Sequence, residues 1–132
     1  MPLSKTELDI LLTEAEICCI ATTKPNGDPH VVPIWFIWRN GKIYFETDTT
    51  TVKFANIQKH NRVMLCFGGK DTYLVEGSVT WCTEAELGFP IRQLYWQKYP
   101  NHMEDSYIND KTLLFEVLPD KVQSWHYGPS WD

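Results

Sequence analysis

The stretch Ile20–Phe67 decides the fold of this chain, and it reads IATTKPNGDPHVVPIWFIWRNGKIYFETDTTTVKFANIQKHNRVMLCF. Its Asn26-Gly27 and Asn40-Gly41 dipeptides are typical of tight hairpin turns, and runs rich in β-branched and aromatic residues flank both of them. The pattern therefore predicts three antiparallel strands in succession, over Ile17–Thr23, His30–Trp38 and Ile43–Thr47.

The rest of the chain adds helices and further strands. Ser4 and Glu7 have the spacing of a capping box, Pro90 interrupts a helical pattern, and Gly77 marks a predicted bulge. Helices are predicted over Lys5–Glu16, Val52–Lys59 and Thr83–Tyr99. The further strands are predicted over Val63–Phe67, Tyr73–Cys82, Thr112–Leu118 and Val122–Tyr127. Short strands with few helices predict a single mainly-β domain over residues 1–132, built as a closed or partly closed antiparallel barrel.

Composition and charge exclude several classes of function. The net charge is -5, so the chain has no general electrostatic attraction to nucleic acid or to anionic membranes. No apolar run approaches the roughly 18 residues of a membrane span. The first residues lack the basic start and apolar centre of a secretory signal. We therefore expect a cytoplasmic domain that binds neither nucleic acid nor membrane.

The four cysteines do not predict a metal site. None of Cys18, Cys19, Cys66 and Cys82 belongs to a Cys-x-x-Cys pair. Cys18 and Cys19 are adjacent in a predicted strand, so their side chains should point to opposite faces. We expect reduced, buried thiols that act as small hydrophobic side chains, and we expect no bound metal.

One predicted strand is apolar on both faces. Val31–Trp38 is an uninterrupted apolar run, and successive strand side chains point to opposite sides of a sheet. One set can fill the barrel, and the other then needs its own cover. Pro33 lacks a backbone donor, which favours an edge or irregular position. The second face is covered either by a helix or by a partner subunit or flat ring, and the residues alone leave both options open.

A polar cluster precedes the second predicted helix. The segment Asp48–Lys53 contains one aspartate, three threonines and a lysine. It lies at the start of a predicted helix, where the first backbone N–H groups have no intrahelical acceptor. Such a terminus attracts anions, and Lys53 adds a full charge, so a phosphate monoester would fit. The alternative is that the threonines only cap the helix and that Lys53 is solvated.

The order of these motifs resembles the pyridoxamine-phosphate-oxidase-like, FMN-binding split-barrel family. An Ala-Thr strand, an Asn-Gly turn and a Pro-His pair precede Val-Pro-x-Trp-Phe at Val32–Phe36. A Gly-Lys-Ile-Tyr-Phe-x-Thr strand follows at Gly41–Thr47, and then Thr51, Lys53 and Asn56 match the start of the family's helix. Each motif is loose by itself, but their order and spacing are fairly specific.

The resemblance implies a six-stranded antiparallel split β-barrel that forms a homodimer, with a flavin at each subunit interface. It places the isoalloxazine ring beside Val32, Pro33, Ile34 and Trp35. It brings Glu46 and Thr47 to the cofactor mainly through their backbone, and it assigns the phosphate to Thr51 and Lys53. Thr72 occupies the place where the oxidases carry a glutamine toward the flavin.

Two departures from the family pattern narrow the function. Thr51-Val52-Lys53 stands where the oxidases have Ser-Arg-Lys, and the C-terminal arginine-rich substrate motif is missing, which argues against vitamin B6 oxidation. We expect an oxidoreductase that uses FMN, or alternatively the deazaflavin F420, on a small organic substrate. Both cofactors carry a phosphate on a ribityl chain. The sequence identifies no catalytic residue, because the cofactor would carry the redox chemistry.

Three other functions remain as alternatives. The missing substrate motif also fits a non-catalytic flavin-binding protein that carries electrons. A haem protein on the same barrel would need an axial ligand, and none of the four histidines has a suitable motif around it. An OB-like barrel for single-stranded nucleic acid would need a basic, aromatic stripe, which the acidic sequence lacks.

Overall fold

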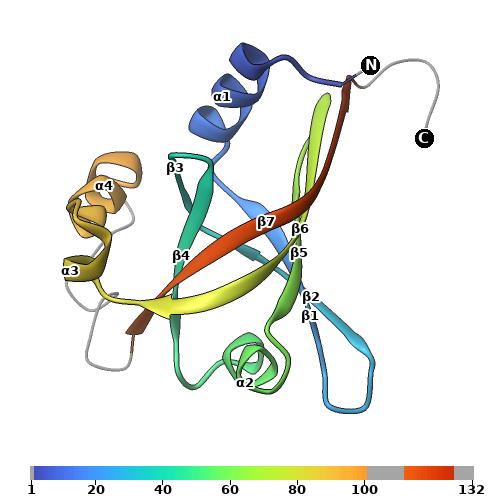
Figure 1. Ribbon diagram of the computed structural model, residues 1–132, viewed down its shortest axis with the longest axis vertical. Helices are drawn as coiled ribbons and strands as arrows, with labels where there is room; N and C mark the ends of the chain where they lie inside the picture. The colour runs from blue at the N-terminus through green and yellow to red at the C-terminus, as the bar shows by residue number, and fades with distance from the viewer. Residues whose placement is uncertain (1, 101–111, 127–132) are drawn as a thin grey trace.

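The computed structural model describes residues 2–100 and 112–126, and its strands form one curled antiparallel sheet (Figure 1). The sheet has seven strands in the order β2-β1-β5-β6-β7-β4-β3. The strands are β1 Cys18–Thr23, β2 Pro29–Ile34, β3 Ile37–Arg39, β4 Lys42–Asp48, β5 Arg62–Phe67, β6 Asp71–Cys82 and β7 Thr112–His126. The helices are α1 Lys5–Glu14, α2 Val52–Lys59, α3 Glu84–Leu87 and α4 Ile91–Lys98.

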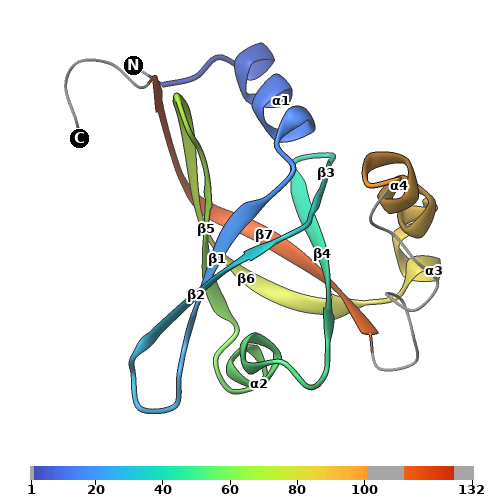
Figure 2. The same cartoon turned by 180° about the vertical axis from the view of Figure 1, so that it is seen from behind.

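The two edge strands of the sheet, β2 and β3, are consecutive in the chain. Only Trp35 and Phe36 separate the end of β2 from the start of β3. Three steps between α-carbons span at most about 11 Å, so the two edges must lie close together. The sheet therefore curls into a split barrel, and the chain crosses from one edge to the other in Figure 2. We call this two-residue crossing the seam.

The mainly-β split barrel is confirmed, but the predicted continuous strand His30–Trp38 is wrong. It is interrupted at the seam and forms the two strands β2 and β3. The sheet has seven strands, where the resemblance implied six. Helix α4 explains the interruption. The Phe36 N–H donates to the Tyr99 hydroxyl at 3.1 Å, and the Lys98 ammonium donates to the Phe36 carbonyl at 3.0 Å. These side chains replace the strand partners that the backbone loses at the seam.

The last two predicted strands are also one strand in the structure. β7 continues through Pro119 and Asp120, and every residue of β6 lies in the stretch that pairs with it. The register shifts between Glu76 and Gly77, which confirms the predicted bulge at Gly77. A side chain at this position would collide with the Leu118 backbone, so glycine is required by the close approach of β7. The predicted end at Tyr127 lies outside the described residues.

The helices agree more closely with the sequence pattern. α2 begins and ends where it was predicted, and Ser4 forms the predicted capping box with Glu7 at the start of α1. α1 ends two residues earlier than expected. The predicted helical stretch before Tyr99 is divided into α3 and α4 by a turn that ends at Pro90.

Two apolar clusters hold these elements together. The barrel interior is filled by alternate strand residues, with Ile20, Phe45 and Val75 completely buried. A second cluster lies on the outer face of β4, where α3 and α4 cover it (Figure 1). Tyr44 packs there with Tyr95 of α4, so β4 is buried on both faces.

The cysteines divide into two groups. Cys18 and Cys82 are buried as expected, whereas Cys19 and Cys66 are exposed, so the expectation of buried thiols is wrong for these two. The opposite orientations predicted for Cys18 and Cys19 are confirmed by their burial. Within the described ranges, no helix is long and apolar enough to cross a membrane.

Candidate functional site

Five of the predicted site residues line one hollow of about 250 Å³ beside the seam. The hollow lies where the end of β2, the end of β4 and the start of α2 meet. It is lined by Ile17, Pro33, Ile34, Trp35, Glu46 and Lys53. The structure therefore brings together the apolar run and the lysine of the polar cluster, which are separate in the sequence.

The apolar wall of the hollow is held rigidly from behind. Pro33 is exposed on the outer face of β2, while Ile34 points into the barrel core. The ring of Trp35 stacks on that of Tyr99, with centroids 4.7 Å apart and planes inclined by 11°. The Tyr99 hydroxyl in turn donates to the Glu16 carbonyl at 2.7 Å. The wall is thus positioned by α4, a contribution that the sequence pattern did not indicate.

Lys53 supplies a positive charge on the first turn of α2. Burial lowers the pKa of its ammonium, and the nearby Asp48 carboxylate opposes this shift. Lys53 makes no hydrogen bond or ion pair with any residue of the ranges 2–100 and 112–126. A partly buried cation without an acceptor is costly. This side chain therefore has the properties of a group that binds an anionic ligand.

The threonines around Lys53 bond to one another and to the backbone. The Thr51 hydroxyl donates to the Asp48 carbonyl at 2.9 Å and accepts from the Phe54 N–H at 3.3 Å. The Thr47 hydroxyl lies 3.1 Å from that of Thr51. The interpretation of Thr51 as a helix cap is therefore confirmed, and its hydroxyl is engaged within the protein.

The Asp48 carboxylate does not occupy the free N–H groups at the start of α2. Its carboxylate accepts from both the N–H and the hydroxyl of Thr50, each at 2.8 Å, and is held in a local turn. The first N–H groups of an α-helix have no intrahelical acceptor. Since Thr51 takes only the Phe54 N–H, those of Val52 and Lys53 stay available as donors beside the Lys53 charge.

Glu46 of β4 lines the hollow. Its side chain is completely buried beneath α4, 3.3 Å from the Arg92 guanidinium. Burial raises the pKa of the Glu46 carboxyl, and Arg92 opposes that shift. Among the residues that the structure describes, neither carboxyl oxygen has a hydrogen-bond donor in good geometry. The alternation of side chains along a strand predicts that Glu46 faces outward, because the preceding Phe45 faces the barrel interior. Nothing in the sequence near Glu46 indicates that Arg92 is its neighbour.

Four predicted residues do not line the hollow, namely Val32, Thr47, Thr51 and Thr72. Val32 packs against the barrel core, and Thr47 is buried. Thr72 pairs with Trp125 near one end of β7, whereas β4 meets the other end at Thr112. Thr72 does not line the hollow of its own subunit.

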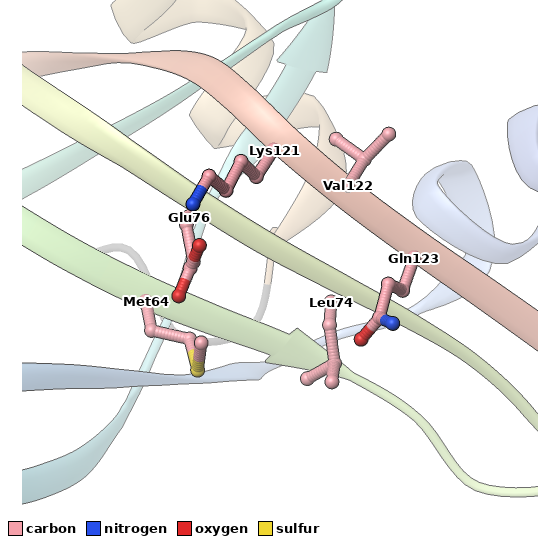
Figure 3. Close-up of a pocket in the computed structure, with 6 residues that line it drawn as sticks. All are labelled: Met64, Leu74, Glu76, Lys121, Val122 and Gln123. Carbon is pink, nitrogen blue, oxygen red and sulfur yellow. The ribbon is translucent and has the colours of Figure 1, made fainter.

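A second hollow, of about 440 Å³, lies on the outer face of β5, β6 and β7. Figure 3 shows its lining, with Lys121 and Glu76 on neighbouring strands and Met64 beside them. Val122 is 54% exposed on its rim. None of the predicted site residues lines this hollow, and the sequence pattern did not indicate it.

The hollow beside the seam suits one class of ligand well. A flat apolar group would lie on Pro33 and beside Trp35, and an attached phosphate would meet Lys53 and the free N–H groups of α2. The cation that lacks an acceptor is the feature that a phosphate would satisfy. The residues present therefore fit a flavin-type cofactor, although one cation fewer faces the phosphate than in the oxidase pattern.

Comparison with solved structures shows the same fold in several proteins. A conserved hypothetical protein of Mycobacterium tuberculosis superposes with a TM-score of 0.77 at 20% identity, over 95% of this chain and 86% of that one. A pyridoxamine 5'-phosphate oxidase-related, FMN binding protein of Nostoc punctiforme gives 0.68 at 18% identity, over 94% and 85%. An F420 reductase gives 0.72 at 20% identity, over 87% and 94%.

Comparison at the level of sequence families extends this result. No curated protein matches the chain. The family model described as pyridoxamine 5'-phosphate oxidase matches residues 4–126, nearly the whole chain. With this match, and with the split barrel and the hollow beside its seam in place, the chain belongs to the pyridoxamine 5'-phosphate oxidase-like family.

Proposed function

We propose that the hollow beside the seam binds FMN, with F420 as the alternative, and that the protein is an oxidoreductase acting on a small organic substrate. The observation that carries this proposal is Lys53, a partly buried cation that has no acceptor within the described ranges. Its position next to an apolar wall matches a molecule that is flat at one end and phosphorylated at the other.

Each residue of the hollow has a distinct role in this proposal. Lys53 and the N–H groups at the start of α2 would bind the phosphate. Pro33 and Trp35 would flank the ring, and the backbone of Glu46 would line the path between them. Thr51 would act indirectly, by fixing the start of the helix. When bound, the cofactor supplies the redox chemistry, and these residues orient it and exclude water from one side.

We further propose a homodimer with the hollow at the subunit interface. Ile17 lines the hollow and is 51% exposed, so an apolar part of its rim faces outward. Thr72 does not line the hollow of its own chain, so in this proposal it would approach the cofactor from the other subunit. Light scattering at several concentrations would test the dimer, and a monomer throughout would overturn it.

The first experiment identifies the chromophore. The purified protein should show a flavin or deazaflavin absorption band, and mass spectrometry of the released compound should distinguish FMN from F420. Protein without chromophore should bind one of the two in a fluorescence titration. A protein that binds neither, and that instead acquires a haem absorption band, would refute the proposal.

A second experiment separates an enzyme from an electron carrier. Reduced nicotinamide or reduced F420 would be offered as donor with a panel of quinones and enones as acceptors. Turnover above that of free flavin would support an oxidoreductase. Tight cofactor binding without such turnover would favour the carrier.

A further inference from the structure

The two exposed cysteines lie directly opposite each other on neighbouring strands. In the antiparallel register of β1 and β5, Cys19 is paired with Cys66. Both side chains are on the outer face of the barrel, since their strand neighbours Ile20 and Leu65 are completely buried inside it. Both thiols are free.

This placement meets the geometric needs of a disulfide. Directly opposite residues of an antiparallel pair have α-carbons about 4.5 to 5.5 Å apart, and their side chains leave the sheet on the same side. Disulfides join residues whose α-carbons are about 4.4 to 6.8 Å apart. Rotation of the two side chains therefore suffices, and the strands need not move.

The other two cysteines cannot compete for this bond. Cys18 points into the barrel, on the opposite face of β1. Cys82 lies in the cluster beneath α4, and its thiol donates to the Leu114 carbonyl at 3.7 Å. Cys19 and Cys66 are thus the one pair of the four whose thiols share a face and face each other in register.

We propose that Cys19 and Cys66 form a dithiol site that small-molecule disulfides oxidise reversibly. A thiolate of the pair attacks one sulfur of the small disulfide, which gives a mixed disulfide and releases one small thiol. The second thiolate then attacks the protein sulfur of that mixed disulfide, which forms the Cys19–Cys66 bond and releases the second small thiol. Two protein thiols lose two protons and two electrons, and the small disulfide gains them.

The surroundings of the pair affect its rate of reaction and its influence on the site. Burial and the neighbouring Cys19 raise the pKa of the Cys66 thiol, so exchange should become faster as the pH rises. Cys19 is also paired with Pro33 on its other side. The Cys19–Cys66 bond would therefore join β1, the direct neighbour of the Pro33 strand, to β5. This site does not depend on the identity of any cofactor.

Thiol counting and mass spectrometry test the proposal. The reduced protein should show two thiols that react with dithionitrobenzoate, and four after denaturation. After treatment with oxidised glutathione, the native count should fall to none and the denatured count to two. The intact mass should decrease by two hydrogens, and peptide mapping should join the peptides of Cys19 and Cys66.

Variants make the result specific. Cys66→Ser should gain one glutathione on Cys19 and keep it, because the resolving thiol is absent. Cys82→Ser, which retains a donor for the Leu114 carbonyl, should still form the internal bond. Stable glutathione adducts on the unmodified protein, a disulfide between two chains, or a native protein with no reactive thiols would each overturn the proposal.

Discussion

Two partly buried lysines near the seam differ in one respect. Lys98 of α4 donates to the Phe36 carbonyl and lies over the Phe36 ring, 3.7 Å from its centroid. Lys53 of α2 makes no such contact within the described residues. Burial lowers the pKa of both ammonium groups. The difference teaches that Lys98 is satisfied within the fold and supports the seam, whereas Lys53 remains available for a ligand.

The largest expected effect is a loss of stability when Tyr99, at the end of α4, is truncated. Tyr99 is 2% exposed, stacks on Trp35 and accepts from the Phe36 N–H. Tyr99→Ala should lower the free energy of unfolding by about 3 to 5 kcal/mol, because it removes a buried aromatic ring and its hydrogen bonds. Urea unfolding would measure the change. Trp96→Ala, on the exposed side of the same helix, is the control and should cost far less.

The next largest effect is expected on binding through Lys53. Lys53→Met should weaken FMN binding by about 1.5 to 3 kcal/mol, the scale of a hydrogen bond to a charged group. The free energy of unfolding without ligand should not fall, since Lys53 has no hydrogen-bonded or ion-paired partner within the described residues and its burial disfavours the charge. Fluorescence titration and urea unfolding would measure the two effects. Lys59→Met, on the exposed last turn of α2, is the matched control. Equal affinities for the two variants would place the phosphate elsewhere.

A smaller effect is expected for the cap of α2. Thr51→Ala should lower the free energy of unfolding by about 1 kcal/mol, the usual value of a helix cap, and Thr51→Ser should restore most of it. Because the hydroxyl is bonded within the protein, FMN affinity should fall less than in Lys53→Met. A loss in affinity as large as that of Lys53→Met would show that Thr51 contacts the phosphate directly.

The last expected effect is a dependence of stability on pH. The pKa of Lys98 is lowered from 10.5 to about 8 by burial, so the unfolded chain binds more protons than the folded one between these values. Stability conferred by Lys98 should therefore rise with pH from about 8 to 10.5. Buried thiols and tyrosines act in the opposite direction, so the measurement is the difference in unfolding free energy between the natural protein and Lys98→Met across this range. A difference that is flat or that declines would refute it.

Local sequence signals predicted much of the fold and the site. The Asn-Gly turns located the first strands, and α2 was placed at its observed ends because cap and apolar spacing agree there. The resemblance grouped Pro33, Trp35 and Lys53, which come from separate motifs, and all three line one hollow. The resemblance made this possible, since neither motif alone specifies where the other lies in space.

The errors arise from contacts between distant parts of the chain. The interruption at Phe36 depends on Tyr99, which lies 63 positions further along. The continuity of β7 depends on pairing with β6, which overrides the turn signal of Pro119 and Asp120. Burial of Cys66 was misjudged because a residue type that is usually buried faces outward here. None of these features leaves a periodic signal in its own segment.

The seam also determines where the chain tolerates insertions. Both edges of the sheet are joined by Trp35 and Phe36, so a residue added there would displace β2 from β3 and move the wall of the hollow relative to α2. The turn at Asn26-Gly27 closes a hairpin remote from that wall (Figure 1), and extra residues there would lengthen a loop at little cost. Variation in length among natural or engineered forms should therefore collect at the hairpin turn and be excluded from the seam.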